Sequence, residues 1–268
     1  MDVTSFLGLE ATGDPCRWRL PVSQGVCSGV GALFGGAGLG AAVQALEETT
    51  GRRCVWAVAQ YLSFARPPSV VDLELVEAKV GGSVTQARVV ARVDGEEIFT
   101  VNAALGDRRE KHVGEWATKP AVPPPDECPP RIMMSRHEGT ITERLDARLA
   151  DARRFEDLDG TPAPGGCSSL WVRIPELGSH LGTTAAALAI VGDFVPFGVS
   201  QALGRPVGGT SLDNSLRIVH RIESEWVLAD IRIQAAANGF AHGALLLWSR
   251  SGSFLGQASQ TVVVRSWR

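Results

Sequence analysis

The stretch Gly36–Thr50, with the sequence GAGLGAAVQALEETT, decides the fold because it predicts one long apolar helix ahead of a series of strands. Leu39, Val43 and Leu46 recur at the spacing of one helix face. Gly51 follows directly, and glycine is a common residue just beyond the end of a helix. We therefore expect a single helix over this stretch.

The residues after this helix predict four strands of an antiparallel sheet. Asp94-Gly95, between the third and the fourth strand, is a strong signal for a tight hairpin turn. The four extended runs are Cys54–Phe64, Val70–Val80, Val84–Val93 and Ile98–Leu105.

The last third of the chain repeats this plan. A second helix is expected over His180–Val191, and a second hairpin turn at Ser251-Gly252. Gly95 and Gly252 are 157 residues apart, and the two arginines that close the first strand of each copy, Arg66 and Arg221, are 155 apart. The matching extended runs are Thr210–Val219, Trp226–Ile233, Gly239–Trp248 and Phe254–Val264.

Two copies of a helix wrapped by a curved antiparallel sheet predict an α+β fold, the double hotdog. One copy alone leaves a sheet edge unpaired, and two copies in one chain can pair those edges. We expect residues 1–118 to form the N-terminal repeat, 119–168 a linker rich in proline and charge, and 169–268 the C-terminal repeat. One short helix is expected in the linker near Glu143–Phe155. Two unrelated α+β halves are the alternative.

Composition excludes several classes of protein. The chain has 268 residues, of which 44% are hydrophobic and 21% charged, so it is not broadly disordered. The formal charge is −3 and no basic stripe is visible, which argues against a nucleic-acid partner. Five cysteines without a CxxC pair indicate neither a disulfide framework nor a zinc site, so no metal is expected.

The same sequence predicts a cytoplasmic protein. The first residues lack the basic and apolar regions of a signal peptide. The longest apolar stretch, Thr183–Val199, is interrupted by Asp193 and Pro196, so we expect no membrane span.

Four short segments resemble the type II acyl-CoA thioesterases, and their order and spacing match that family as well. They are Leu33-Phe34-Gly35-Gly36, Ser211-Leu212-Asp213-Asn214-Ser215, Glu225-Trp226-Val227-Leu228 and Gly256-Gln257-Ala258-Ser259-Gln260. The resemblance implies an acyl-CoA substrate, no cofactor, and further assembly into a homo-oligomer, either a dimer or a tetramer. It also implies that Asp213 and Gln260 are catalytic.

The chain departs from the family pattern at two places. Asn214 stands where the family usually has histidine, and the family's third catalytic residue, Thr or Ser, has no hydroxyl counterpart. Gln234 is the nearest uncharged polar residue, and we take it as the candidate for the third position.

Thioester hydrolysis needs an activated water and a site for the developing oxyanion. Asp213 can accept the proton of the water, and Gln260 can orient it, provided that the sheet brings the two together. Gly35 and Gly36, at the start of the first helix, can bind the oxyanion through backbone amides. Alternatively, the two glycines only permit close packing of the helix.

The position of Asp213 is open to two interpretations. It alternates with apolar neighbours and so lies on the polar face of its strand, where it could be solvated or paired with Arg217. The repeat favours function, because the first-copy counterparts of Asp213 and Gln260 are the apolar residues Val58 and Ala103. The polar pair is thus expected in one copy alone.

Two other functions remain open from the sequence. The departures from the family pattern are compatible with a protein that binds acyl-CoA or acyl-lipid without catalysis. A hotdog hydratase or dehydratase is less favoured, because no Asp–His or Glu–His motif of that type is visible. No GxSxG serine motif is present either.

Overall fold

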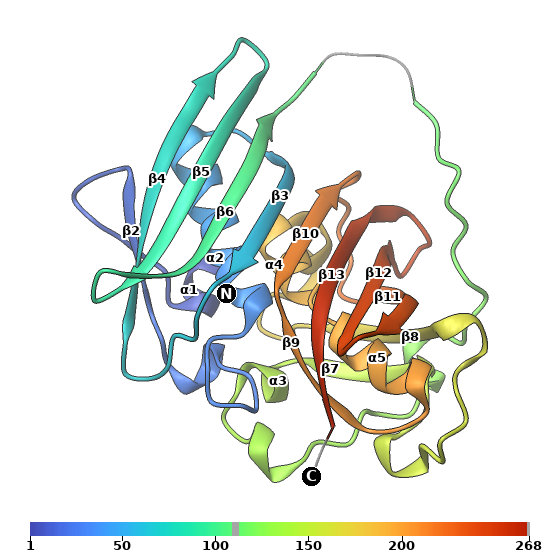
Figure 1. The fold of residues 1–268 in the computed structure, drawn as a ribbon. Helices are drawn as coiled ribbons and strands as arrows, with labels where there is room; N and C mark the ends of the chain where they lie inside the picture. Colours follow the sequence, from blue (N-terminus) through green and yellow to red (C-terminus); the bar gives the residue numbers. More distant parts are fainter. Residues whose placement is uncertain (109–112, 267–268) are drawn as a thin grey trace.

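The computed structural model describes residues 1–108 and 113–266, and its strands form one antiparallel sheet (Figure 1). The N-terminal strands are β1 (Glu10–Ala11), β2 (Arg17–Pro21), β3 (Cys54–Tyr61), β4 (Val70–Val80), β5 (Val84–Val93) and β6 (Glu96–Gly106). The others are β7 (Asp146–Asp151), β8 (Cys167–Arg173), β9 (Val207–Ser211), β10 (Asp213–Ile218), β11 (Val227–Ala237), β12 (Phe240–Ser249) and β13 (Phe254–Ser266). The helices are α1 (Val3–Leu7), α2 (Gly35–Thr50), α3 (Ile141–Arg144), α4 (Ala185–Val191) and α5 (Val195–Leu203).

The strand order repeats between the two halves, which confirms the expected double hotdog. Strands β4, β5, β6 and β3 follow one another toward the centre of the sheet, as do β11, β12, β13 and β10 from the other side. The edge strands β3 and β10 then pair with each other, antiparallel, with Val58 opposite Ser215. The two half-sheets therefore form one continuous surface, as expected for repeats whose free edges satisfy each other.

The first hairpin has the predicted chemistry. Asp94 and Gly95 both have positive φ angles, of 50° and 87°, which is the conformation that two-residue turns between twisted strands require. The strands on either side, β5 and β6, pair along their whole length.

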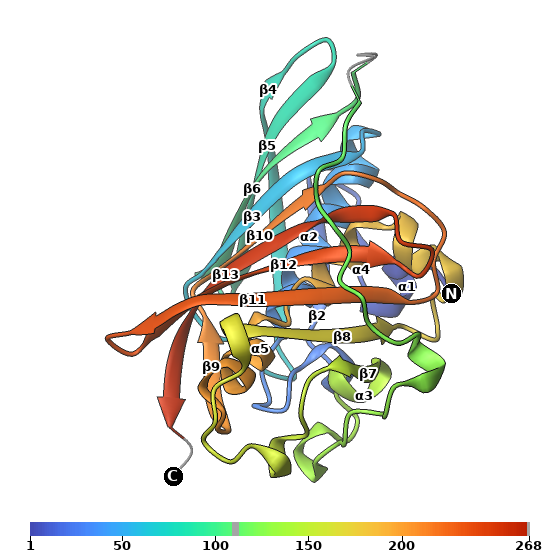
Figure 2. The same cartoon turned by 90° about the vertical axis from the view of Figure 1, so that its right-hand side faces the viewer.

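Two apolar helices fill the space inside the curve of the sheet (Figure 2). Helix α2 packs directly on α4, and the contact is close because small residues face each other. A Cβ atom on Gly40 would lie 2.7 Å from the carbonyl oxygen of Ala186, and one on Gly36 would lie 2.8 Å from that of Ala189. These glycines therefore allow the two helix backbones to touch, which is the packing role considered above for Gly36.

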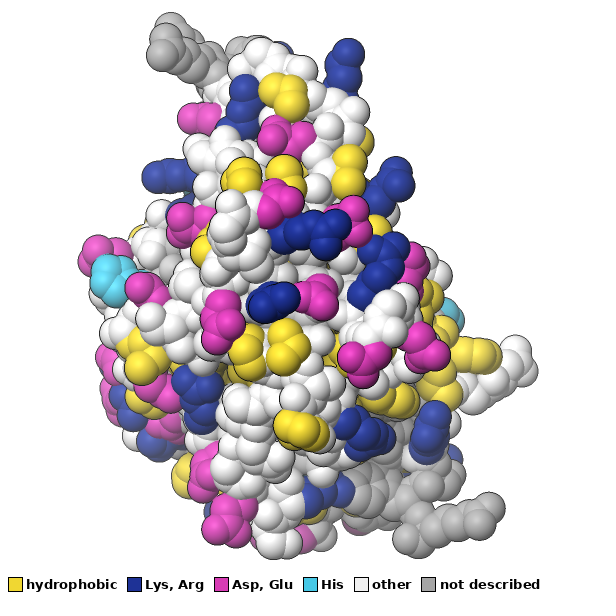
Figure 3. Space-filling model, turned by 90° about the vertical axis from the view of Figure 1, so that its left-hand side faces the viewer, with side chains coloured by type: hydrophobic (Ala, Val, Ile, Leu, Met, Phe, Trp, Pro, Cys, Tyr) yellow, Lys and Arg dark blue, Asp and Glu magenta, His cyan; other side chains and the backbone are white. Residues whose placement is uncertain are grey.

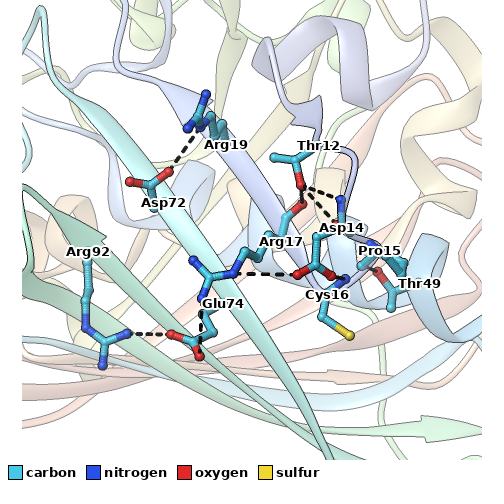
Figure 4. Close-up of polar contacts among 10 residues, drawn as sticks. All are labelled: Thr12, Asp14, Pro15, Cys16, Arg17, Arg19, Thr49, Asp72, Glu74 and Arg92. Carbon is cyan, nitrogen blue, oxygen red and sulfur yellow. Dashed lines mark hydrogen bonds and ion pairs between the residues drawn. The ribbon is translucent and has the colours of Figure 1, made fainter.

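The outer face of the N-terminal half-sheet carries charges of both signs (Figure 3). On β2, β4 and β5 they form ion pairs, with Arg19 3.2 Å from Asp72 and Arg92 2.9 Å from Glu74 (Figure 4). These side chains are largely solvated, so each pair adds little stability. One face of the half-sheet is thus polar and the other buried, as an antiparallel sheet allows.

The linker differs from its expected structure. Where a helix was expected near Glu143–Phe155, the α-helix is limited to Ile141–Arg144, a 3-10 turn begins at Phe155, and Asp146–Asp151 forms β7 beside β8. The reason is alternation: Ala147 and Leu149 are buried on one side of the strand. Part of the expected linker therefore extends the C-terminal half-sheet.

The second helix also differs. Residues Gly178–Thr183 form a 3-10 turn, α4 starts at Ala185, and α5 follows after a break at residues 192–194. Ala185–Leu203 is the one helical stretch in the described residues that is long and apolar enough to cross a membrane, and 83% of its most apolar window is buried inside the protein. It is the core helix of the second repeat.

Candidate active site

The break between α4 and α5 places a carboxylate in the centre of the protein. Asp193 is 7% exposed, and one of its oxygens, Oδ2, accepts a hydrogen bond of 2.6 Å from the amide of Gly36. The other oxygen, Oδ1, accepts a hydrogen bond from Nε2 of Gln260. Gly36 belongs to the first turn of α2, so the N-terminal repeat holds one side of a carboxylate that the C-terminal repeat supplies.

Both the oxygen and the nitrogen of the Gln260 side-chain amide are hydrogen-bonded within the protein. It lies on the inner side of β13 and is 3% exposed. Its Nε2 also donates to the hydroxyl of Ser211 at 2.9 Å, and its Oε1 accepts from the amide of Val195 at 3.2 Å. Both of its N–H donors are therefore engaged, and the side chain holds Asp193 in place.

The surroundings of Asp193 bring the pKa of its carboxyl group close to neutral pH. Burial raises the pKa of Asp193 to about 7, although the hydrogen bonds from Gln260 and Gly36 lower it in part. A carboxyl group with such a pKa can both take and release a proton at neutral pH.

A tyrosine hydroxyl without a partner lies beside this carboxylate. A Cβ atom on Gly35 would be 2.9 Å from Oδ2 of Asp193 and 3.0 Å from the hydroxyl oxygen of Tyr61. Among the described residues, none makes a hydrogen bond with this buried hydroxyl. Burial, with the negative charge of Asp193, raises the pKa of Tyr61 well above its usual value, so the group remains an O–H donor.

Asn214 adds a second unsatisfied group. Its side chain is fully buried next to the Tyr61 hydroxyl, whose pKa it lowers in part, and neither its Nδ2 nor its Oδ1 has a partner at hydrogen-bond distance and angle among the described residues. Unpaired buried polar groups are costly, so these two groups make the region around Asp193 a candidate for a functional site.

Asp193 and Tyr61 lie at a cavity of about 370 Å³. Its wall includes Gly35, Tyr61, Asp193 and Ser211. A second cavity of about 360 Å³ adjoins it, because the two share Arg131, Phe155, Phe197, Ser200 and Val207 in their linings. The second cavity is mostly apolar and includes Leu149 and Pro206.

Contrary to expectation, the side chains of Asp213 and Gln260 do not come together. Ser215 lies opposite Ser259, and their hydroxyls are 2.7 Å apart, so they share one face of the sheet. Asp213, two residues from Ser215, points to that face, whereas Gln260, next to Ser259, points to the inner one. One oxygen of Asp213, Oδ1, accepts from the amide of Thr261 at 2.7 Å. The carboxylate that contacts Gln260 is Asp193.

The other predicted residues divide between the two sides of the sheet. Gly35 lines the larger cavity, and the Gly36 amide is engaged by Asp193. Gln234 is exposed at a bulge of β11 and lines neither cavity. The catalytic roles assigned to Gln234 and Asp213 stay predictions.

Sequence reasoning missed Asp193 and Tyr61. A signal for Asp193 was present: it is the lone acidic residue in the apolar stretch Thr183–Val199. In a buried segment such a carboxylate needs hydrogen-bond partners or a shifted pKa. Tyr61, at the end of a strand, gave no comparable signal.

A family model described as the acyl-CoA thioesterase C-terminal domain matches residues 125–264, more than half of the chain. This chain belongs to the acyl-CoA thioesterase family. A solved structure from Novosphingobium aromaticivorans, provisionally described as a thioesterase, agrees with this assignment. Its sequence is 33% identical to this chain, and the TM-score is 0.83. That match covers 95% of this chain and 97% of that one.

Two further structures show the same fold at lower identity. A hot dog fold protein of unknown function from Alicyclobacillus acidocaldarius is 19% identical to this chain, with a TM-score of 0.85. The match covers 99% of this chain and 98% of that one. The acyl-CoA thioesterase II TesB2 of Mycobacterium marinum is 22% identical with a TM-score of 0.75, and the match covers 99% of both chains. No curated protein matches the sequence.

Proposed function

We propose that this thioesterase-family protein hydrolyses acyl-CoA thioesters to a carboxylic acid and CoA, using a carboxylate as general base, and that this carboxylate is Asp193. The observation that carries the proposal is its position: a buried carboxylate with a pKa of about 7, held by Gln260, on the wall of a cavity. A base with a pKa near the working pH is the most effective one.

The reaction follows from these contacts. A water molecule beside Asp193 attacks the thioester carbon as one of its protons passes to the carboxylate. The tetrahedral intermediate then collapses, the carbon–sulfur bond breaks, and the CoA thiolate receives that proton from Asp193. Gln260 acts as a positioning residue, because its amide keeps the carboxylate directed toward the cavity.

The oxyanion of the intermediate needs hydrogen-bond donors. The amide of Gly36 already serves Asp193, so it is the amide of Gly35, together with the hydroxyl of Tyr61, that we assign to the oxyanion. Each such preorganised donor contributes about 3–4 kcal/mol to the stabilisation of the transition state. The adjoining apolar cavity suits the acyl chain.

Release of CoA thiol tests the function, measured over acyl-CoA substrates of several chain lengths. Asp193→Asn should lower kcat by about 100-fold or more, the range of general-base losses. Asp213→Asn is the matched comparison, since it makes the same change on the other face of the sheet, and it should keep most of the activity.

If Asp213→Asn lost its activity and Asp193→Asn kept it, Asp213 would be the general base. Tight binding of acyl-CoA by the wild-type protein without thiol release at any chain length would instead indicate a binding protein. Thermal unfolding of each variant shows that the fold is intact.

Two properties of the intact protein complete the proposal. The five cysteines are all free, which suits a reducing compartment such as the cytoplasm. Assembly into a homo-oligomer is checked by light scattering on the purified protein.

A further inference from the structure

Arg131 stands at the junction of the two cavities. Its backbone is fixed next to the sheet, since its amide donates to the carbonyl of Ala147 at 2.8 Å. Its guanidinium carbon lies 5.9 Å from the ring centres of both Phe194 and Phe197. The side chain lines both cavities.

This cation has no acidic partner. Among the described residues, no carboxylate lies within ion-pair distance of Arg131. Arg52, which is also partly buried, lacks one as well, whereas several other partly buried arginines have one. Those pairs are Arg144 with Glu176, Arg148 with Asp146, Arg173 with Asp146, and Arg221 with Glu47. A desolvated cation without a counterion is unfavourable unless a ligand supplies the negative charge.

The charge of Arg131 faces a cavity with little acidic lining. Among the described residues that line it, Asp193 is the one acid. Burial, with Arg136 nearby, lowers the pKa of Arg131 to about 10, so it remains charged at neutral pH. Burial together with the two arginines lowers the pKa of His137 to about 4, so this residue is neutral there.

The place of Arg131 identifies which part of the substrate would carry the charge. Its guanidinium carbon lies 5.9 Å from the ring centre of Phe194, the residue that follows Asp193, and no ion pair joins Arg131 to Asp193. Arg131 and Asp193 line the same cavity, so a short acyl group with its thioester at Asp193 can bring its far end to Arg131. The phosphates of CoA, in contrast, are separated from the thioester by the whole pantetheine arm.

We propose that Arg131 binds a carboxylate at the far end of a short acyl group, so that the preferred substrates are CoA thioesters of dicarboxylic acids. This inference rests on the proposed function, because it places the thioester at Asp193. A charge-assisted, two-pronged contact between guanidinium and carboxylate is the strongest recognition available to such a group.

The test compares glutaryl-CoA with pentanoyl-CoA, which have the same number of acyl carbons and differ in the terminal carboxylate. The wild-type protein should have the higher kcat/KM for glutaryl-CoA. Arg131→Met should lower that value by about 10- to 100-fold and leave pentanoyl-CoA within about twofold. Arg173→Met is the matched control, because Arg173 is also partly buried but is already paired with Asp146 at 2.9 Å and lines neither cavity. It should change neither value.

Thioesters of N-acetylcysteamine separate the two possible sources of the anion, because they carry the same acyl groups without phosphates. If Arg131 binds the acyl carboxylate, the selective loss persists with them. A loss that disappears with these substrates, or one that is equal for both acyl groups, overturns the proposal.

A failure of the proposed function gives a different result. In that case the wild-type protein hydrolyses neither CoA thioester, and calorimetry with the non-hydrolysable thioether analogues still tests Arg131. Tighter binding of the glutaryl analogue, lost in Arg131→Met, supports the anion site, and equal binding of both analogues refutes it.

Discussion

Replacing Tyr61 with phenylalanine removes one oxygen atom and should change activity and stability in opposite directions. The ring keeps its place, because its edge contact with Phe99, at 6.3 Å between ring centres, does not involve the hydroxyl. That hydroxyl is buried, and none of the residues that the structure describes makes a hydrogen bond with it. Its removal therefore relieves a cost of desolvation, and the free energy of unfolding should stay the same or rise by up to about 2 kcal/mol.

The effect on catalysis follows from the assigned role. Loss of one oxyanion donor lowers kcat by about 10²- to 10³-fold, equivalent to about 3–4 kcal/mol of transition-state stabilisation. KM should change little, because the donor acts mainly on the developing charge. The assays are steady-state thiol release for kcat and KM, and urea unfolding for stability.

A matched control separates the two effects. Thr85, on β5, is 1% exposed, and its buried hydroxyl also has no partner within residues 1–108 and 113–266; it lines neither cavity. Thr85→Val should match Tyr61→Phe in having unchanged or higher stability, and it should keep full activity. Normal kcat in Tyr61→Phe would refute the oxyanion assignment, and a fall in kcat explained by lower stability would assign the hydroxyl a structural role.

Three further predictions concern the same core. Gln260→Leu removes a hydrogen bond that lowers the pKa of Asp193, so the acidic limb of the kcat/KM profile should move above pH 7; an unmoved limb would contradict the assignment of Asp193 as base. In the wild type, the folded Asp193 keeps its proton to about pH 7 and the unfolded one loses it near 3.8, so stability should fall by up to about 4 kcal/mol as pH rises between these values. Asp193→Asn should lack this slope in urea unfolding at pH 4.5 and 8, and an equal slope in both proteins would place the pKa elsewhere. Gly40→Ala should destabilise the protein by about 1–3 kcal/mol, because the new methyl group would lie 2.7 Å from the Ala186 carbonyl, whereas Gly82→Ala, in open space, should not.

Much of the fold could be predicted because its signals are local. The runs Val70–Val80 and Val84–Val93 coincide with β4 and β5, since alternation and turn residues set their limits. Strand β7 was missed because prolines and charges around it conceal the alternation of Ala147 and Leu149. Its strand conformation depends on pairing with β8, which is a tertiary contact.

The site was harder to predict for a physical reason. Ser211 lies opposite Val262, whereas Ser215 lies opposite Ser259, so the pairing shifts by one residue near Leu212. This shift turns Ser211 toward Gln260 and Asp213 away from it, although simple alternation gives both the same face. Resemblance found Gln260 but could not show which carboxylate it contacts.

The hydrogen bond between the Gly36 amide and Asp193 joins one repeat to the other. Its two halves come from different places in the two copies, a glycine in the first turn of α2 and an acid that follows α4. In a symmetric dimer of separate single-repeat chains, every chain would have to carry both the glycine and the acid. Fusion into one polypeptide removes that constraint, because each copy can then evolve a different half of the same contact.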